Sequence, residues 1–235
     1  QLAPPNVNVC TIEDPIEMVE LAFNQMQVQA GIGLDFASGI RTLMRQDPDI
    51  VMVGEVRDLE TADMAIQAAL TGHLVLSTLH TNDAPSAVTR LLDLGVPPYL
   101  IHSTILAVMA QRLVRTLCPH CREAAEIDAQ TWSMLIAPWQ AEKPQQIYQA
   151  KGCLECRMTG YSGRIGIYEI LLMSAAQRPL ITAEADFTLI RDQAYRDGMK
   201  PLRISGAMKV AAGTTTVDEV LKAAPALSGD RRSKP

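Results

Sequence analysis

Apolar residues in the first half of the chain form short continuous runs, separated by stretches with helical spacing. Residues 50–53 are wholly apolar, and residues 74–79 are mostly so. Runs of this length and composition are typical of strands buried on both faces of a parallel sheet. Residues 7–11 form a third short stretch, rich in β-branched side chains. We therefore predict three strands in this region.

Helical periodicity fills the gaps between these strands. Phe36, Ile40 and Leu43 recur at the spacing that places side chains on one face of a helix. Each predicted helix also has a residue suited to cap its start and a residue that stops it. The predicted helices begin after Asp35, Asp58 and Asp83, and they end before Pro48, at Gly72 and at Gly95. Strands that alternate with helices predict an α/β fold with a mainly parallel sheet.

The pattern changes at Cys118. Residues 118–170 are rich in cysteine, glycine and turn residues, with short strands expected near residues 164–172, whereas residues 175–224 are helical in pattern. Thr216 and Glu219 have the spacing of a helix capping box. We divide the chain into a core at 1–117, a cysteine subdomain at 118–172, a helical region at 173–224 and a flexible tail at 225–235.

One stretch has the length of a short membrane span. Residues 94–111 carry no formal charge, but Pro97 and Pro98 interrupt them near the start. We expect the remainder to form a buried helix of about 12 residues, which is too short to span a bilayer. The first nine residues lack the basic and apolar regions of a signal peptide. We therefore expect a soluble, cytoplasmic protein with no membrane span.

Composition and charge exclude one large class of function. The chain has 235 residues, 48% of them hydrophobic, and a formal net charge of −5. Binding to nucleic acid backbones requires clustered positive charge that neutralises phosphates. This acidic chain has no dense run of Lys or Arg, so we expect no nucleic-acid partner.

Reactive side chains follow each of the three predicted strands. Glu13 and Asp14 follow the first, Glu55 follows the second and His80 follows the third. Ligands of open α/β sheets bind outside the carboxyl ends of the strands. Such a set suits phosphoryl transfer to water, because carboxylates can orient water and hold the shell of Mg²⁺. Taken singly, each carboxylate could equally be a helix cap, and the histidine could be structural.

The amino-acid sequences of these segments are more specific than the chemistry of their reactive side chains. Residues 11–17 (TIEDPIE), 47–58 (DPDIVMVGEVRD) and 70–83 (LTGHLVLSTLHTND) closely resemble the Asp box, the Walker B segment and the His box of type II secretion and type IV pilus assembly ATPases. The similarity runs from about Val9 to Gly213. The resemblance implies a RecA-like P-loop ATPase core with a tetracysteine zinc subdomain and C-terminal helices.

The resemblance also implies roles for five residues. Glu55 would be the general base, and His80 would sense the γ-phosphate of ATP. Glu13 and Asp14 would help to order Mg²⁺ and its waters. Glu55 would belong to the same nucleotide and Mg²⁺ set, and Glu13 would also belong to the catalytic set. Arg57 belongs to the implied nucleotide and Mg²⁺ set, although we expect it to form a salt bridge with Asp58 or another neighbour and not to act as an arginine finger.

The phosphate-gripping loop of such enzymes is not in the printed sequence. A Walker A loop, G-x-x-x-x-G-K-[ST], holds the β- and γ-phosphates, and the chain has no Gly-Lys pair. The resemblance places this loop upstream of the Asp box. We favour the interpretation that the chain is the C-terminal portion of a longer ATPase, inactive alone and without the P-loop strand. The alternative is a natural pseudo-ATPase.

Four cysteines form two C-x-x-C pairs, Cys118 with Cys121 and Cys153 with Cys156, separated by 31 residues. Two such pairs match a tetrahedral structural Zn²⁺ site, and residues 128–150 would form an insertion between them. Redox or disulfide use is the main alternative, and four unpaired thiols are the remaining one. The redox alternative is weakened because one pair would suffice and because the first pair is expected to follow a long helix. The resembled ATPases often carry this subdomain.

The remaining expectations come from the resemblance alone. It implies a homo-hexamer that uses ATP, Mg²⁺ and Zn²⁺ and drives pilin or pseudopilin assembly. Contact with the inner membrane would be peripheral, through platform components of the machine. The sequence does not separate type II secretion from pilus extension. The rival function is a non-catalytic, zinc-stapled adaptor subunit of the same machinery.

Overall fold

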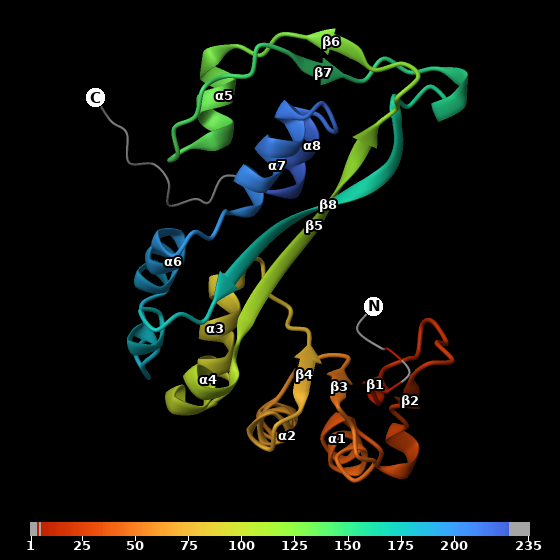
Figure 1. The fold of residues 1–235 in the computed structure, drawn as a ribbon, viewed down its shortest axis with the longest axis vertical. Helices are drawn as coiled ribbons and strands as arrows, with labels where there is room; N and C mark the ends of the chain where they lie inside the picture. The colour runs from red at the N-terminus through yellow and green to blue at the C-terminus, as the bar shows by residue number, and fades with distance from the viewer. Residues whose placement is uncertain (1–3, 5, 226–235) are drawn as a thin grey trace. The chain divides into compact units, whose positions relative to one another are not determined.

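The computed structural model describes residue 4 and residues 6–225 of the chain (Figure 1). Contacts divide the chain into two compact units. The first comprises residues 1–107 and 173–194, and the second comprises residues 108–172 and 195–235. These units cut the chain after residues 107, 172 and 194, so only the cut at 172 coincides with a boundary drawn from the sequence. The sequence-based division separates the chain by function, and it stays a prediction. Its flexible tail at 225–235 lies, except for residue 225, outside the described residues.

A four-stranded parallel sheet forms the centre of the first unit, in the order β2-β1-β3-β4. All three predicted strands are present, and β2 is an addition. Its polar sequence, NQMQ, offers no apolar run to detect, and it is recruited by backbone pairing with β1. The strands are β1 (Val9–Glu13), β2 (Asn24–Gln27), β3 (Ile50–Val53) and β4 (Leu74–Ser77).

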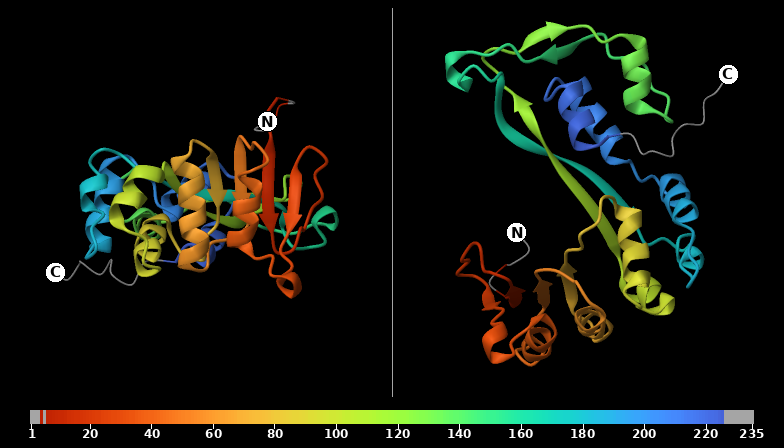
Figure 2. Two further views of the ribbon diagram at one scale, coloured as in Figure 1. Left: turned by 90° about the horizontal axis from the view of Figure 1, so that it is seen from below. Right: turned by 180° about the vertical axis from the view of Figure 1, so that it is seen from behind.

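Two helices, α1 (Phe36–Leu43) and α2 (Leu59–Leu70), pack on one face of this sheet (Figures 1 and 2). Asp35 and Asp58 cap them as predicted, each accepting a backbone N–H three residues on. The α/β core between sheet and helices is aliphatic, in keeping with the shortage of aromatic residues. Its buried members are Cys10, Ile12, Ile40, Leu43, Val51, Val53, Ala65 and Ala68.

Strand β4 differs from its prediction as a buried strand. Val75 packs against the core, but Leu74 and Leu76 are 38% and 40% exposed. Within the described residues β4 pairs with β3 alone, so it is an edge strand. Side chains alternate across a strand, and only the face of Val75 is covered. Strand β4 therefore has the apolar composition of a central strand, although it lies at the edge of the described sheet.

The expected buried helix of about 12 residues is wrong. Helix α3 (Ala84–Asp93) follows its predicted cap, Asp83, and helix α4 (Pro98–Thr104) has only seven residues. The chain then becomes extended at Ile105 and enters strand β5 (Ala107–Leu117). Exposed and covered residues alternate along β5, but the exposed positions include Met109 and Leu113, so the sequence carries no clear period of two. No helix of the described residues has the length and apolar character that crossing a bilayer requires.

The second unit is built on a ribbon of β5 and β8 (Tyr161–Leu172). β8 is one long strand where short strands were expected. Strands β6 (Glu123–Ala125) and β7 (Ile147–Gln149) form an antiparallel pair. The predicted insertion is not a free loop, because Trp132 and Leu135 of α5 (Ala129–Ile136) are buried in a core with the C-terminal helices. The helices after β8 are α6 (Phe187–Arg196), α7 (Leu202–Ala211) and α8 (Val217–Ala223). Along the described chain, short 3-10 turns lie at Ala30–Ile32, Leu154–Cys156 and Arg178–Leu180.

The predicted capping box of α8 is half formed. The Thr216 hydroxyl accepts the backbone N–H of Glu219 at 3.4 Å. The Glu219 carboxylate does not return to Thr216. It accepts the backbone N–H of Arg115 at 3.1 Å and the Arg115 guanidinium at 2.6 Å, which ties α8 to β5.

Candidate functional site

The carboxyl ends of β1, β3 and β4 lie side by side at one edge of the sheet. Ile12 pairs with Val53, and Val53 pairs with Ser77. The chain continues this order beyond the strands, because the Gly54 N–H donates to the Ile12 carbonyl at 2.8 Å and the Thr78 hydroxyl donates to the Gly54 carbonyl at 2.7 Å. The loops that carry the three predicted functional segments therefore leave the sheet next to one another.

Glu55 and His80 meet at this edge. The Nε2 atom of His80 lies 2.8 Å from Oε2 of Glu55, and a guanidinium nitrogen of Arg57 lies 2.5 Å from Oε1. Nε2 must carry a proton here, since an ionised carboxylate only accepts. The Glu55 side chain is 14% exposed, whereas those of Arg57 and His80 are 62% and 84% exposed. The carboxylate is thus recessed behind two solvent-facing partners.

These contacts set the protonation of Glu55. The Arg57 guanidinium, aided by the hydrogen bond from His80, holds the pKa of Glu55 below its ordinary value, and partial burial opposes this only in part. The pKa of Arg57 is raised by Glu55 and, more weakly, by the charge of Asp14. Glu55 is therefore ionised, and both of its oxygens are engaged. Arg57 forms the expected salt bridge with a neighbour, but the partner is Glu55 and not Asp58, whose side chain caps α2.

Glu13 makes a different set of contacts. Its Oε1 atom accepts the Thr11 hydroxyl at 2.6 Å and the Gln25 amide at 2.9 Å. Within the described residues no hydrogen bond links it to Glu55. The structure therefore joins Glu55, Arg57 and His80 directly, brings Asp14 near through Arg57, and holds Glu13 on the neighbouring strand. Sequence reasoning missed Thr11 and Gln25, because only the pairing of β1 with β2 shows their role.

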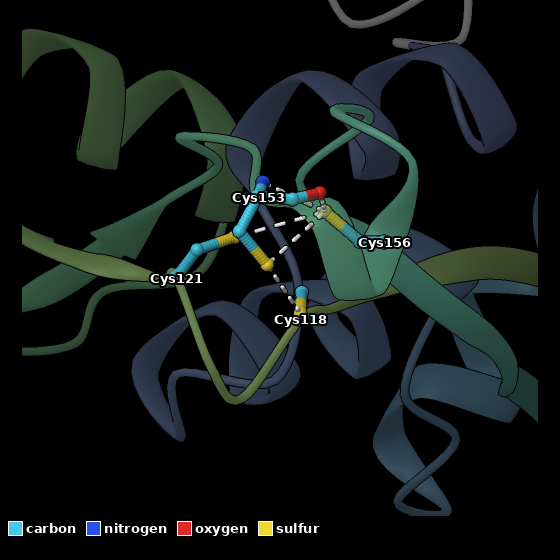
Figure 3. A group of neighbouring side chains, drawn as sticks. All are labelled: Cys118, Cys121, Cys153 and Cys156. Carbon is cyan, nitrogen blue, oxygen red and sulfur yellow. Dashed lines mark hydrogen bonds between the residues drawn. The ribbon is translucent and has the colours of Figure 1, made fainter.

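The second candidate site is the cysteine cluster of the second unit (Figure 3). The four sulfur atoms all lie within 4.8 Å of one another. Cys118 and Cys153 are 3.9 Å apart, while Cys121 and Cys153 each lie 3.8 Å from Cys156. A tetrahedron of sulfurs around Zn²⁺, with Zn–S bonds of about 2.3 Å, has edges of about 3.8 Å. The four thiols fit a zinc ion, and they are too far apart for disulfides, whose S–S length is about 2.0 Å.

Local backbone structure prepares this cluster for a cation. The N–H groups of Cys153 and Gly160 each donate to Cys156 Sγ at 3.2 Å. Burial alone would raise the pKa of Cys156, but these N–H groups and the neighbouring thiols lower it to about 6. Burial raises the pKa of Cys121 to about 12, with the other three thiols adding to the effect. Cys156 therefore ionises readily, whereas ionising Cys121 beside it requires a positive charge in the cluster.

One argument for zinc from the sequence is wrong. The first cysteine pair follows strand β5, which ends at Leu117, and not a long helix. The preceding element therefore says nothing against redox chemistry. The geometric argument replaces it: a dithiol needs one pair, and here two pairs converge on one point.

Comparison with known proteins identifies the family. The sequence model described as "Type II/IV secretion system protein" matches residues 1–222. The chain belongs to this family. The type IV pilus assembly ATPase TfpB of Acinetobacter baylyi is 59% identical over 225 residues, which are 96% of this chain and 38% of that protein. Type II secretion system protein E of Pseudomonas aeruginosa is 48% identical over 215 residues, which are 92% of this chain and 42% of that protein.

Two solved structures share the fold of this chain. The crystal structure of the pilus retraction motor PilT with bound ADP aligns with a TM-score of 0.65 at 25% identity, covering 96% of this chain and 55% of that one. The ATPase DotB of Legionella pneumophila aligns with a TM-score of 0.60 at 24% identity, covering 92% and 50%. The predicted RecA-like α/β fold is therefore confirmed. The chain spans about two-fifths of the length of the two curated relatives described above.

Proposed function

We propose that this chain is the catalytic part of an ATP-hydrolysing motor subunit that powers protein secretion or type IV pilus assembly. The observation that carries the proposal is the contact of 2.8 Å between Glu55 and His80, at the carboxyl ends of adjacent parallel strands. Ligands of this fold class bind at that edge. The family and its ATPase members supply the reaction class.

Each residue at this edge has a role that its contacts support. Glu55 is the general base that takes a proton from the attacking water, and His80, the more exposed partner, senses the γ-phosphate. Glu13 and Asp14 are the residues that would hold the waters around Mg²⁺. When bound, Mg²⁺ neutralises charge on the phosphate oxygens. Arg57 supports the site as the partner of Glu55.

The observed contacts describe a resting arrangement of the base. Both Glu55 oxygens accept hydrogen bonds from cationic or protonated partners, and Arg57 keeps the pKa of Glu55 low. A carboxylate in this state is a weak base. Catalysis therefore requires Arg57 or His80 to release one oxygen toward the water when ATP is bound.

In this proposal the phosphates of ATP are bound by a P-loop that is not part of the printed sequence. The edge strand β4 has one partner in the described part of the chain and exposes Leu74 and Leu76. A further parallel strand beside β4 would bring a P-loop to the same edge as Glu55 and His80. The chain alone would then bind ATP very weakly, and micromolar Mg²⁺-dependent binding in calorimetry would refute this.

The cysteine cluster is proposed to hold a structural Zn²⁺ through Cys118, Cys121, Cys153 and Cys156. Four protein ligands leave no open coordination position, so the ion would brace the fold without taking part in hydrolysis. The intact protein is proposed to act as a cytoplasmic homo-hexamer, peripheral to the inner membrane through platform components. These assembly claims rest on the family and not on a feature of this chain.

The direct experiment is an ATPase assay of the full-length protein. We expect Mg²⁺-dependent hydrolysis that falls by two to four orders of magnitude in Glu55→Gln, the usual scale for losing a general base. Full-length protein that binds zinc but neither binds nor hydrolyses ATP would instead support the adaptor function.

A further inference from the structure

Glu13 is anchored by two donors on neighbouring strands. Thr11 and Gln25 are direct partners across the parallel pair of β1 and β2. Both donate to the same atom, Oε1 of Glu13, at 2.6 and 2.9 Å. Thr11 is fully buried. The two donors therefore fix one carboxylate oxygen from the protein side.

The orientation of the Gln25 amide is determined by its other contacts. Its second N–H donates to the Met18 carbonyl at 3.1 Å, and its oxygen accepts the Glu20 N–H at 2.7 Å. Turning the amide over would direct its oxygen at the Glu13 carboxylate and an N–H group at the Glu20 N–H. Both contacts would then be repulsive, so only one orientation satisfies all three partners.

Glu55 and Glu13 differ in whether a carboxylate oxygen remains free to accept a further hydrogen bond. Both oxygens of Glu55 are engaged, whereas Oε2 of Glu13 accepts no hydrogen bond from any described residue. We propose that Thr11 and Gln25 are positioning residues that anchor Oε1 of Glu13 and leave Oε2 for a water of the Mg²⁺ shell. This inference rests on the proposed ATPase function. Partners that orient a metal-binding group commonly matter nearly as much as the group itself.

Gln25 also joins Glu13 to the loop between β1 and β2. The loop is held through the Met18 carbonyl and the Glu20 N–H. Gln27, two residues further along β2, holds the same loop by accepting the Ile16 N–H at 3.2 Å. Gln27 is the strand partner of Glu13, but within the described residues its side chain makes no hydrogen bond to the Glu13 carboxylate. The pair of glutamines therefore separates an effect on the carboxylate from an effect on the loop.

The test compares four variants of the full-length protein by steady-state kinetics. Thr11→Val and Gln25→Leu each remove one donor to Glu13, and we expect kcat to fall by about 10- to 100-fold with little change in KM for ATP. Thr11→Ser keeps a hydroxyl and should restore most of the rate. Gln27→Leu loses a loop contact only and should match the parent protein. Melting temperatures establish that each variant is folded. Measured with ATP over a series of Mg²⁺ concentrations, they also report Mg²⁺ binding without turnover, and Thr11→Val and Gln25→Leu should need more Mg²⁺ than Gln27→Leu for the same increase in melting temperature.

A double-mutant cycle with Glu13→Gln shows whether Gln25 acts through Glu13. We expect Gln25→Leu to have no further effect once Glu13 has been replaced. A slow Glu13→Gln together with a fast Gln25→Leu and a fast Thr11→Val would overturn the positioning role alone. A Glu13→Gln protein as fast as the parent would remove the proposed role of Glu13 itself, and the positioning role with it.

Discussion

The two candidate sites differ in how complete they are within this chain. The four sulfurs of the cysteine cluster already lie at the separations that a tetrahedral zinc ion requires, and all four come from described residues. The carboxylates at the strand ends are bound instead to Arg57, His80, Thr11 and Gln25. A structural metal site can be assembled by one short segment, whereas a nucleotide site is shared among several strands and a phosphate-binding loop.

The largest effect is expected from removing one ligand of the complete site, the cysteine cluster. Cys156→Ala should abolish zinc binding, and it should destabilise residues 118–160 by several kcal/mol, because zinc binding contributes on the order of 10 kcal/mol in small zinc domains. Metal analysis of protein purified without chelator would give one zinc per chain for the parent and none for the variant.

Cys10→Ala is the matched control for this prediction. Cys10 is a buried thiol in the core of the other unit and lies outside the cluster. The variant should keep its zinc even if it loses stability. Parent protein without zinc, or Cys156→Ala with a full complement of zinc, would contradict the assignment.

The pH dependence of hydrolysis tests the role of Glu55 in the incomplete site at the strand ends. The base must be ionised to act, so the rate falls as pH drops through the pKa of Glu55. Arg57 is the largest cause that holds this pKa low. In Arg57→Ala the pKa of Glu55 in the free protein should rise, and the acidic limb of the kcat/KM profile, which reports that pKa, should move to higher pH.

Arg90→Ala, on the exposed surface of α3, serves as the control for this profile. It should leave the acidic limb where it is in the parent protein. An unchanged limb in Arg57→Ala would show that Glu55 is not the group whose ionisation controls the rate.

The smallest effect is expected at an ion pair beside the complete site. Glu219→Gln weakens two hydrogen bonds to Glu219, one from the backbone N–H of Arg115 and one from its guanidinium. Because the Arg115 side chain is 45% exposed, the free energy of unfolding should fall by only about 1 kcal/mol. Arg115 lowers the pKa of Glu219. This contribution is therefore present above the ordinary carboxyl pKa, and it disappears as pH falls through the lowered one.

Asp218→Asn is the control, because Asp218 is the exposed neighbour of Glu219 in the first turn of α8. Thermal unfolding at neutral and acidic pH should separate the parent from Glu219→Gln only at neutral pH. A loss that persists undiminished in acid would mean that the ion pair is not its source.

Local signals explain which parts of the fold could be predicted. The helix caps Asp35, Asp58 and Asp83 act within three residues, so the sequence is sufficient to place them. Strand β2 has no apolar pattern, and β5 carries apolar residues on its exposed face, so both depend on pairing with distant segments. The exposure of β4 likewise depends on which strands are its neighbours.

The same distinction holds for the candidate sites. Glu55, His80 and the four cysteines could be named because each stands in a short, recognisable segment. Thr11 and Gln25 could not, since an ordinary threonine and glutamine acquire their contact with Glu13 only through the register of β1 and β2. That Arg57 occupies one Glu55 oxygen, and His80 the other, also required the structure.

The central claim is that Glu55 and its partners form the hydrolytic half of a nucleotide site. Its most direct test is the turnover of full-length Glu55→Gln, measured beside its affinity for Mg²⁺-ATP, with Glu60→Gln on the exposed start of α2 as control. Glu55→Gln should bind Mg²⁺-ATP as the parent does but turn over at least 100-fold more slowly, while Glu60→Gln should be unchanged. Turnover of Glu55→Gln at the parental rate would contradict this claim.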